Sequence, residues 1–183
     1  MRRVAYDIVA TGVLVSGLWM CASPSAQQNA VASDAAPASL RVSIEALGDS
    51  GVSGLVTIHK MGEGVHVEGQ ISGLPPSSEH GFHIHEIGDC SAADGKSAGG
   101  HFNPHQAAHG PLMGVSHVGD LGNVVADENG IAKISVMKKD AVFDGDQGIN
   151  GRAVIVHEKA DDLSSQPSGA AGPRIACGVI QAG

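Results

Sequence analysis

Aromatic side chains are scarce: Phe, Tyr and Trp make up 3% of the 183 residues. A core built from aromatic rings is therefore excluded, and Val, Ile, Leu and Ala must fill the interior. The sequence also lacks the apolar repeat of a long amphipathic helix. Its 26 glycines are instead typical of a turn-rich all-β protein. The chain length predicts one such domain.

Basic residues are few as well, with 11 Lys and Arg against 19 Asp and Glu and a net charge of −8. No basic stripe is present, so we expect no nucleic-acid partner. An acidic protein repels an anionic substrate overall. Steering of such a substrate would need local positive charge.

Apolar runs long enough to cross a bilayer comfortably are also missing, so we expect no stable membrane span. The one pronounced run, Ile8 to Met20, follows two arginines and predicts a secretory signal peptide over residues 1–26. Lipid anchoring through Cys21 is the alternative, although such sites usually have a small residue before the cysteine. The polar, Ala-rich residues 27–39 predict a flexible leader, which leaves residues 40–183 as the folded domain.

Only three cysteines occur. If Cys21 leaves with the signal peptide, Cys90 and Cys177 remain. An even pair in an exported protein indicates one disulfide, whereas without export the pair would be two buried thiols.

Short segments rich in β-branched residues fill most of the domain and are separated by Gly, Asp, Asn and Pro. They predict antiparallel strands of a sandwich or barrel. The segments are Leu40–Leu47, Gly54–Met61, Gly64–Ile71, Gly81–His85, Asn123–Ala126, Ile131–Met137, Arg152–His157 and Ile175–Ile180. Two long stretches, Glu86 to Gly122 and Glu158 to Arg174, interrupt this rhythm. Loops of that length in a compact domain are usually functional.

Histidine is abundant, with ten residues, and most are clustered. His83 and His85 stand two apart in a predicted strand and so share one face. The loop that follows adds a group of donors that suits copper or zinc: His101, His105, His109, His117 and Asp120. Of these, His105 by itself is expected to be an ordinary surface residue.

Two further residues stand at the borders of the second long loop. His157 ends an apolar strand, and Arg174 lies three residues before Cys177. These patterns predict one or two transition-metal sites on a β-sandwich, but spacing alone does not select a reaction.

Five motifs, in family order, resemble those of copper–zinc superoxide dismutase: Gly81–Glu86, His101–Pro104, His117–Gly122, Val156–Leu163 and Arg174–Gly178. The resemblance implies an eight-stranded Greek-key β-sandwich or barrel of immunoglobulin-like architecture with two long functional loops. It also implies conversion of superoxide to oxygen and hydrogen peroxide by alternate reduction and reoxidation of copper.

The resemblance implies roles for individual residues. A copper ion would be held by His83, His85, His101 and His157, and a zinc ion by His101, His109, His117 and Asp120. His101 would bridge the two ions and take part in catalysis. Arg174 would dock the superoxide anion, Asp161 and His80 would orient ligands, and Cys90 and Cys177 would form the disulfide.

The stretch before Arg174 is shorter than in cytosolic eukaryotic members and is similar to that of bacterial periplasmic ones. The resemblance therefore implies a periplasmic enzyme, monomeric or homodimeric, in antioxidant defence. It leaves the steering charges unassigned, and the candidates are Lys60, Lys133, Lys138 and Lys139. Rival interpretations are a copper-delivery or zinc-only module, a metal buffer and a copper-only dismutase; filled zinc positions oppose the last.

Overall fold

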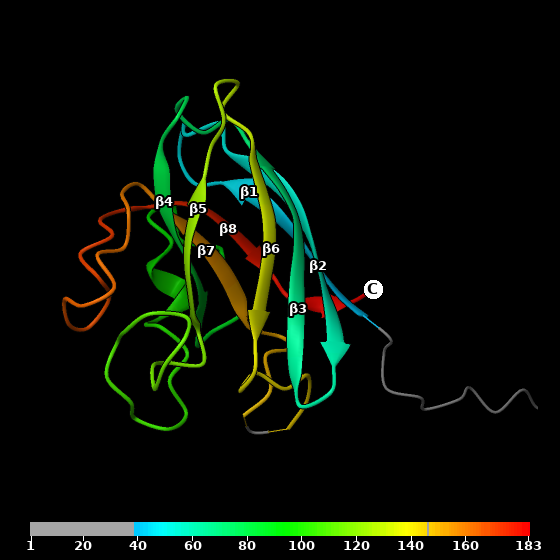
Figure 1. Ribbon diagram of the computed structural model, residues 1–183. Helices are drawn as coiled ribbons and strands as arrows, with labels where there is room; N and C mark the ends of the chain where they lie inside the picture. The colour runs from blue at the N-terminus through cyan, green and yellow to red at the C-terminus, as the bar shows by residue number, and fades with distance from the viewer. Residues whose placement is uncertain (1–38, 146) are drawn as a thin grey trace, which may run out of the picture. The chain divides into compact units, whose positions relative to one another are not determined.

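A computed structural model describes residues 39–145 and 147–183. The predicted signal peptide 1–26, Cys21 and the leader up to residue 38 lie outside the described residues. The described part contains nine strands (Figure 1): β1 (Ser39–Ala46), β2 (Ser53–Met61), β3 (Gly64–Ser72), β4 (Glu79–His85), β5 (Asp120–Val125), β6 (Ala132–Lys138), β7 (Ala153–His157), β8 (Arg174–Val179) and β9 (Gln181–Ala182). A 3-10 turn spans Lys96–Ala98. Within these residues, no helix has the length and apolarity needed to cross a membrane.

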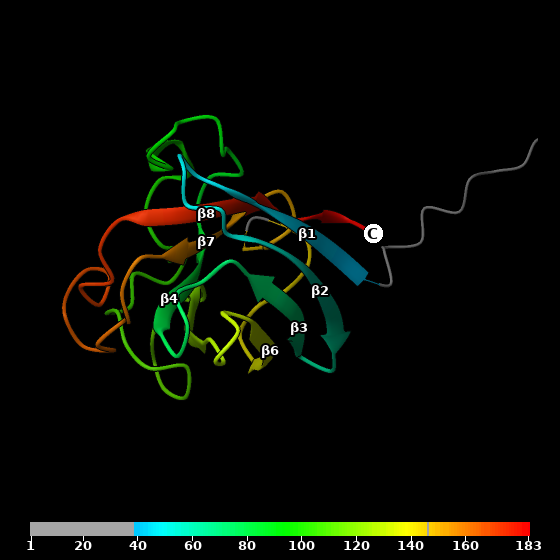
Figure 2. The same ribbon diagram turned by 90° about the horizontal axis from the view of Figure 1, so that it is seen from above.

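The strands form one antiparallel sheet in the order β5-β4-β7-β8-β1-β2-β3-β6, with β9 pairing beside β1. The two end strands, β5 and β6, are consecutive in the chain and are linked through a bridge between Ala126 and Ala132. The sheet therefore curls into a nearly closed barrel (Figure 2). The predicted eight-stranded Greek-key fold is confirmed, and the two-residue β9 is an addition.

Strand boundaries match the sequence pattern closely, and the largest difference is at β5. This strand begins at Asp120, three residues before its expected start at Asn123. Gly122, with a φ of 79°, occupies this stretch, and the β4–β5 register shifts there. A bulge of this kind weakens the alternating pattern and hides the start of a strand in the sequence.

The core follows from the alternation of side chains along the strands. Leu40, Val42 and Ile44 of β1 are almost completely buried, whereas the residues between them are exposed. The expected aliphatic core is present, and all three phenylalanines join it: Phe82, Phe102 and Phe143.

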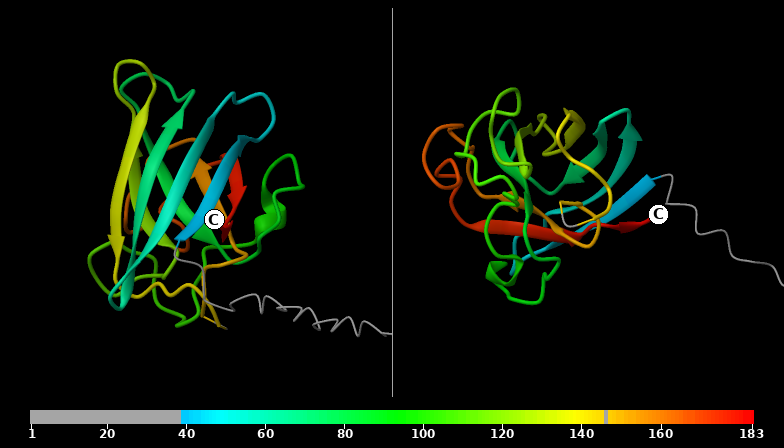
Figure 3. Two further views of the ribbon diagram at one scale, coloured as in Figure 1. Left: turned by 90° about the vertical axis from the view of Figure 1, so that its right-hand side faces the viewer. Right: turned by 90° about the horizontal axis from the view of Figure 1, so that it is seen from below.

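The two long loops contact each other on one side of the barrel (Figures 1 and 3). The first connects β4 to β5, and the second connects β7 to β8. Gln166 of the second loop hydrogen-bonds the backbone of His109 in the first. The disulfide between Cys90 and Cys177 fixes the first loop to β8, as the cysteine count predicts. The strand ends and the two loops thus build the site together.

Candidate metal centre

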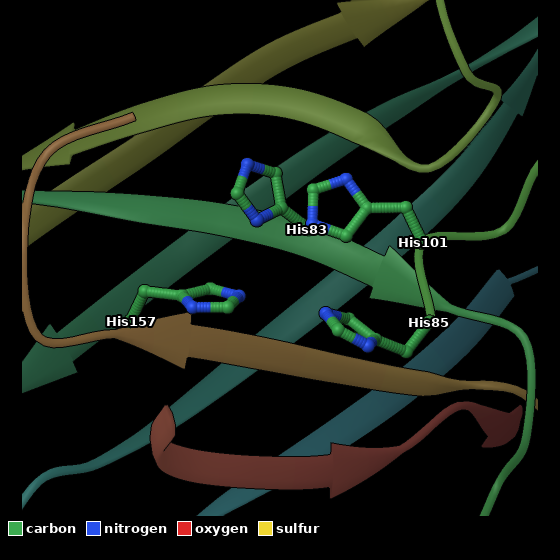
Figure 4. Close-up of side chains that lie close together, drawn as sticks. All are labelled: His83, His85, His101 and His157. Atoms are coloured by element: carbon green, nitrogen blue, oxygen red, sulfur yellow. The ribbon is translucent and has the colours of Figure 1, made fainter. Parts of the chain in front are cut away.

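Four buried histidines gather where β4 and β7 meet the first loop. His83 and His85 project from the same face of β4, and His157 ends the neighbouring strand β7. His101 is held beside them by a β-bridge to His85. One ring nitrogen from each of the four lies within 4.8 Å of the others. Figure 4 shows the four rings facing a common space.

A second group adjoins the first and shares His101. Its members are His101, His109, His117 and Asp120, again with one donor atom each within 4.8 Å. One carboxylate oxygen, Oδ1 of Asp120, lies 2.9 Å from Nδ1 of His101, 3.0 Å from Nδ1 of His109 and 3.2 Å from Nδ1 of His117. Asp120 is fully buried, at the start of β5. The two groups meet through a single imidazole.

Six buried ring nitrogens in these two groups make no hydrogen bond within the described residues: Nδ1 of His83, His109 and His117, and Nε2 of His85, His101 and His157. Buried polar atoms are normally paired, so six unpaired ones in one place need an explanation. Lone pairs that converge at this separation are what a metal ion requires. The donor sets therefore fit metals.

In the first group, the protein holds the opposite ring nitrogen of His85 and that of His157. His85 Nδ1 lies 2.9 Å from the carbonyl of Gly99, and His157 Nδ1 lies 3.1 Å from that of Gly172. Since a carbonyl can only accept, these contacts place the proton on Nδ1 and leave the Nε2 lone pair free. Such hydrogen bonds fix both the tautomer and the direction of a metal-ligating ring.

Burial keeps His83, His85 and His157 of the first group neutral. Desolvation lowers the pKa of His83 to about 4, that of His85 to about 2 and that of His157 to about 3. Neutral imidazole is the form that donates a lone pair to a metal, so at neutral pH these rings bind without first losing a proton.

Asp161 joins the two groups from behind. Its Oδ2 lies 2.8 Å from Nε2 of His83, and its Oδ1 lies 2.9 Å from Nε2 of His109. Burial opposes ionisation of this carboxyl, but hydrogen bonds from the two histidines outweigh burial and lower its pKa to about 2. Asp161 is itself held by Asn123, whose side chain bonds both the N–H and the carbonyl of Asp161.

His80 holds the ligand strand at a different point. Its Nδ1 lies 2.8 Å from the carbonyl of His157, and its Nε2 lies 2.6 Å from Oγ of Ser78. Asn123 and Gln166 serve similar purposes but are not predicted from the sequence. Each of them joins segments that are far apart in the chain, and neither belongs to a local pattern.

Arg174 stands at a pocket of about 400 Å³ that also contains His85, His101, His117 and His157. Its guanidinium donates hydrogen bonds to the carbonyls of Gly95 and Gly99. The side chain is only partly buried. It therefore places a fixed positive charge where a small anion would approach the histidines.

Two sequence candidates lie elsewhere. His105 belongs to neither metal group and is exposed. Lys138, a candidate for steering from the surface, is only 2% exposed, with its Nζ 3.4 Å from both Oδ1 of Asp140 and Oγ of Ser116. The expectation for Lys138 is therefore wrong, because its charge is enclosed at the end of β6.

Comparisons with known proteins agree with this chemistry. Residues 52–180 match the family described as copper/zinc superoxide dismutase. The copper–zinc superoxide dismutase of Saccharomyces cerevisiae is 47% identical over 143 residues, which are 73% of this chain and 92% of the yeast protein. An extracellular copper–zinc superoxide dismutase of Caenorhabditis elegans is 42% identical over 134 residues, 69% of this chain and 60% of the nematode protein.

A solved structure is similar over most of the described domain. The crystal structure of the clock protein EA4 superposes with a TM-score of 0.72 at 42% sequence identity, covering 80% of this chain and 95% of that one.

Proposed function

The chain belongs to the copper/zinc superoxide dismutase family, and we propose which of its residues carry out the family's reaction. It is an oxidoreductase that converts superoxide to oxygen and hydrogen peroxide with copper and zinc as cofactors. The copper ion would be held by His83, His85, His101 and His157, and the zinc ion by His101, His109, His117 and Asp120. The observation that carries this assignment is the membership of His101 in both donor groups.

The donor types support the assignment of copper to the first group and zinc to the second. Three imidazoles and a carboxylate can fill a tetrahedral zinc site, whereas four imidazoles suit copper. His85, His101 and His157 of the four-imidazole group border the pocket of Arg174, whereas His109 and Asp120 of the other group do not, and Asp120 is fully buried. The open side is where redox chemistry needs access, and the closed side is where a structural ion belongs.

Copper supplies the one-electron exchange of the reaction, and zinc, which has no redox chemistry, fixes the geometry. Arg174 would bind the superoxide anion and orient it, because its charge acts in a confined pocket where solvent screens it weakly. His101 Nε2 faces the same space and would take up a proton there and deliver it to the reduced substrate. Arg174 and His101, the residues given these two roles, both line the pocket.

Asp161, His80 and Gln166 would act as positioning residues. The carboxylate of Asp161 binds one histidine from each group and so would hold the two donor groups in place relative to each other. His80 anchors the backbone of His157, and Gln166 anchors that of His109. Such partners orient ligand rings and raise their affinity for metal.

The direct experiment is metal analysis together with activity on the oxidised mature protein. We expect one copper and one zinc per chain, inhibition of a superoxide-driven dye reduction, and loss of that inhibition on copper chelation. His109→Ala should lower zinc content first, whereas His85→Ala should lower copper content first. Equal loss of both metals from each variant would contradict the assignment of separate sites.

We further propose that the chain is exported to the periplasm of a bacterial cell through residues 1–26. The extracellular nematode relative and the disulfide support an oxidising compartment. The mass of the mature protein and its cell fraction test this proposal. A membrane-bound fraction that Cys21→Ser releases would favour the lipid anchor instead. Light scattering would decide between a monomer and a homodimer.

A further inference from the structure

A row of potential metal donors crosses the outer surface of the barrel, away from the two groups described above. The strands β2, β3 and β6 are adjacent, and His59 pairs directly with His66, which pairs in turn with Met137. Residues opposite each other in antiparallel strands point to the same side, with Cβ atoms about 4.5–5.5 Å apart. Figure 3 shows the three strands side by side.

The burial pattern shows that this side faces solvent. The strand neighbours Ile58 and Val67 are fully buried, so His59 and His66, which alternate with them, point outward. The side chains of His59 and His66 are 40% and 24% exposed. Met137 is 43% exposed. A thioether and two imidazoles are therefore aligned and accessible.

A carboxylate completes the cluster. Glu68 lies two residues beyond His66 on the same face of β3. Its Oε1 lies 3.0 Å from Nε2 of His59, and its Oε2 lies 3.7 Å from Nδ1 of His66. Nε2 of His66 also lies 3.0 Å from Oγ of Ser135, so Nδ1 is the nitrogen of that ring left for an ion. Rotation of the partly exposed side chains of His59, His66 and Glu68 would bring their donors to one ion.

We propose that His59, His66, Glu68 and Met137 form a second copper site on the outer surface of the β2–β3–β6 sheet. The donor chemistry selects the metal: paired imidazoles suit copper or zinc, and a thioether adds preference for monovalent copper. Calcium and magnesium are disfavoured, since they take oxygen ligands almost exclusively. The carboxylate suits divalent copper, so the cluster can hold the ion in either oxidation state.

The test uses full-length mature protein with its catalytic copper and zinc already bound. Divalent copper is titrated against a competing chelator, and monovalent copper is titrated in a separate anaerobic assay. We expect one further copper per chain. His59→Ala and His66→Ala should each weaken it by at least about tenfold, because removal of a residue that merely orients a ligand already costs about 10- to 100-fold. Dismutase activity should be unchanged.

Matched variants separate the donors. Met137→Leu should weaken the binding of monovalent copper more than that of divalent copper. Glu68→Gln should weaken the binding of divalent copper more than that of monovalent copper. His105→Ala and Met113→Leu replace an exposed histidine and an exposed methionine outside the row, and both should leave the affinity unchanged. Absence of a further copper, or its retention in both histidine variants, would overturn the proposal. Dismutase activity reports the catalytic site separately.

Discussion

The side-chain amide of Gln166 binds the backbone of His109 on both sides of the residue. Its Oε1 accepts the N–H of His109 at 2.9 Å, and its Nε2 donates to the carbonyl at 2.9 Å. A residue of the second loop thus fixes a proposed zinc ligand of the first loop, so the two loops must order together.

Gln166→Ala should therefore weaken zinc binding by about 10- to 100-fold, the usual cost of losing a partner that orients a ligand. Copper affinity should change less, because the copper group does not include His109. Competition with a zinc chelator measures both effects. Gln166→Glu keeps the acceptor for the N–H of His109 but loses the donor to its carbonyl, so its zinc affinity should fall between those of the wild type and Gln166→Ala. Equal zinc affinity in all three proteins would show that the amide contributes nothing.

Arg174→Ala should lower dismutation by at least about tenfold, because loss of one aligned charge-stabilising donor costs about 100-fold or more in other active sites. Inhibition by small anions should weaken in parallel, since they would use the same charge. Arg174→Lys keeps the charge and should recover part of the dismutation activity and part of the inhibition by small anions. The measurement is steady-state activity at low ionic strength, and wild-type rates in the alanine variant would exclude the docking role.

Reduction of the Cys90–Cys177 disulfide should lower the free energy of unfolding by about 2–5 kcal/mol, because the bond closes a loop of 87 residues. It should also loosen the attachment of the first loop to β8. Thermal or denaturant unfolding after verified reduction measures the change. Cys90→Ser with Cys177→Ser should match the reduced protein, and an unaltered midpoint in both would refute the prediction.

The metal-free protein should lose stability as the pH falls below about 6.5. Burial lowers the pKa of His83 to about 4, of His157 to about 3 and of His85 to about 2, from 6.5 in each case. For each of these histidines, at a pH between the lowered pKa of the folded state and the pKa of 6.5 of the unfolded state, the unfolded chain binds a proton that the folded chain excludes. Stability is then fully present above the unfolded pKa and decreases by about 1.4 kcal/mol per pH unit for each such proton.

Denaturant unfolding of the metal-free protein from pH 7.5 to 4.5 measures this slope. His85→Gln carries no proton in either state and should give a shallower decrease. Constant stability across the range would show that the three imidazoles are not held neutral by burial.

The eight strands follow from the sequence because their signals are local, and the members of the two donor groups follow from the resemblance of five local motifs to a known family. Alternation of apolar residues defines β1, and the spacing of His83 and His85 defines a shared face. The roles of Gln166 and Asn123 could not be predicted, because they depend on contacts between segments 57 and 38 residues apart. The burial of Lys138 could not be predicted either, because its contact with Ser116 joins residues 22 positions apart.

The place of β8 in the sheet sets the order of assembly. This strand lies between β7 and β1, and the last short strand also pairs with β1. The barrel therefore cannot close until β8 has paired with both of its neighbours. Cys177 and Arg174 reach their partners only at that stage. The first loop is tied to β8 through these two residues, so it acquires its final shape only once β8 is in place, and capture of metal is a late step in folding.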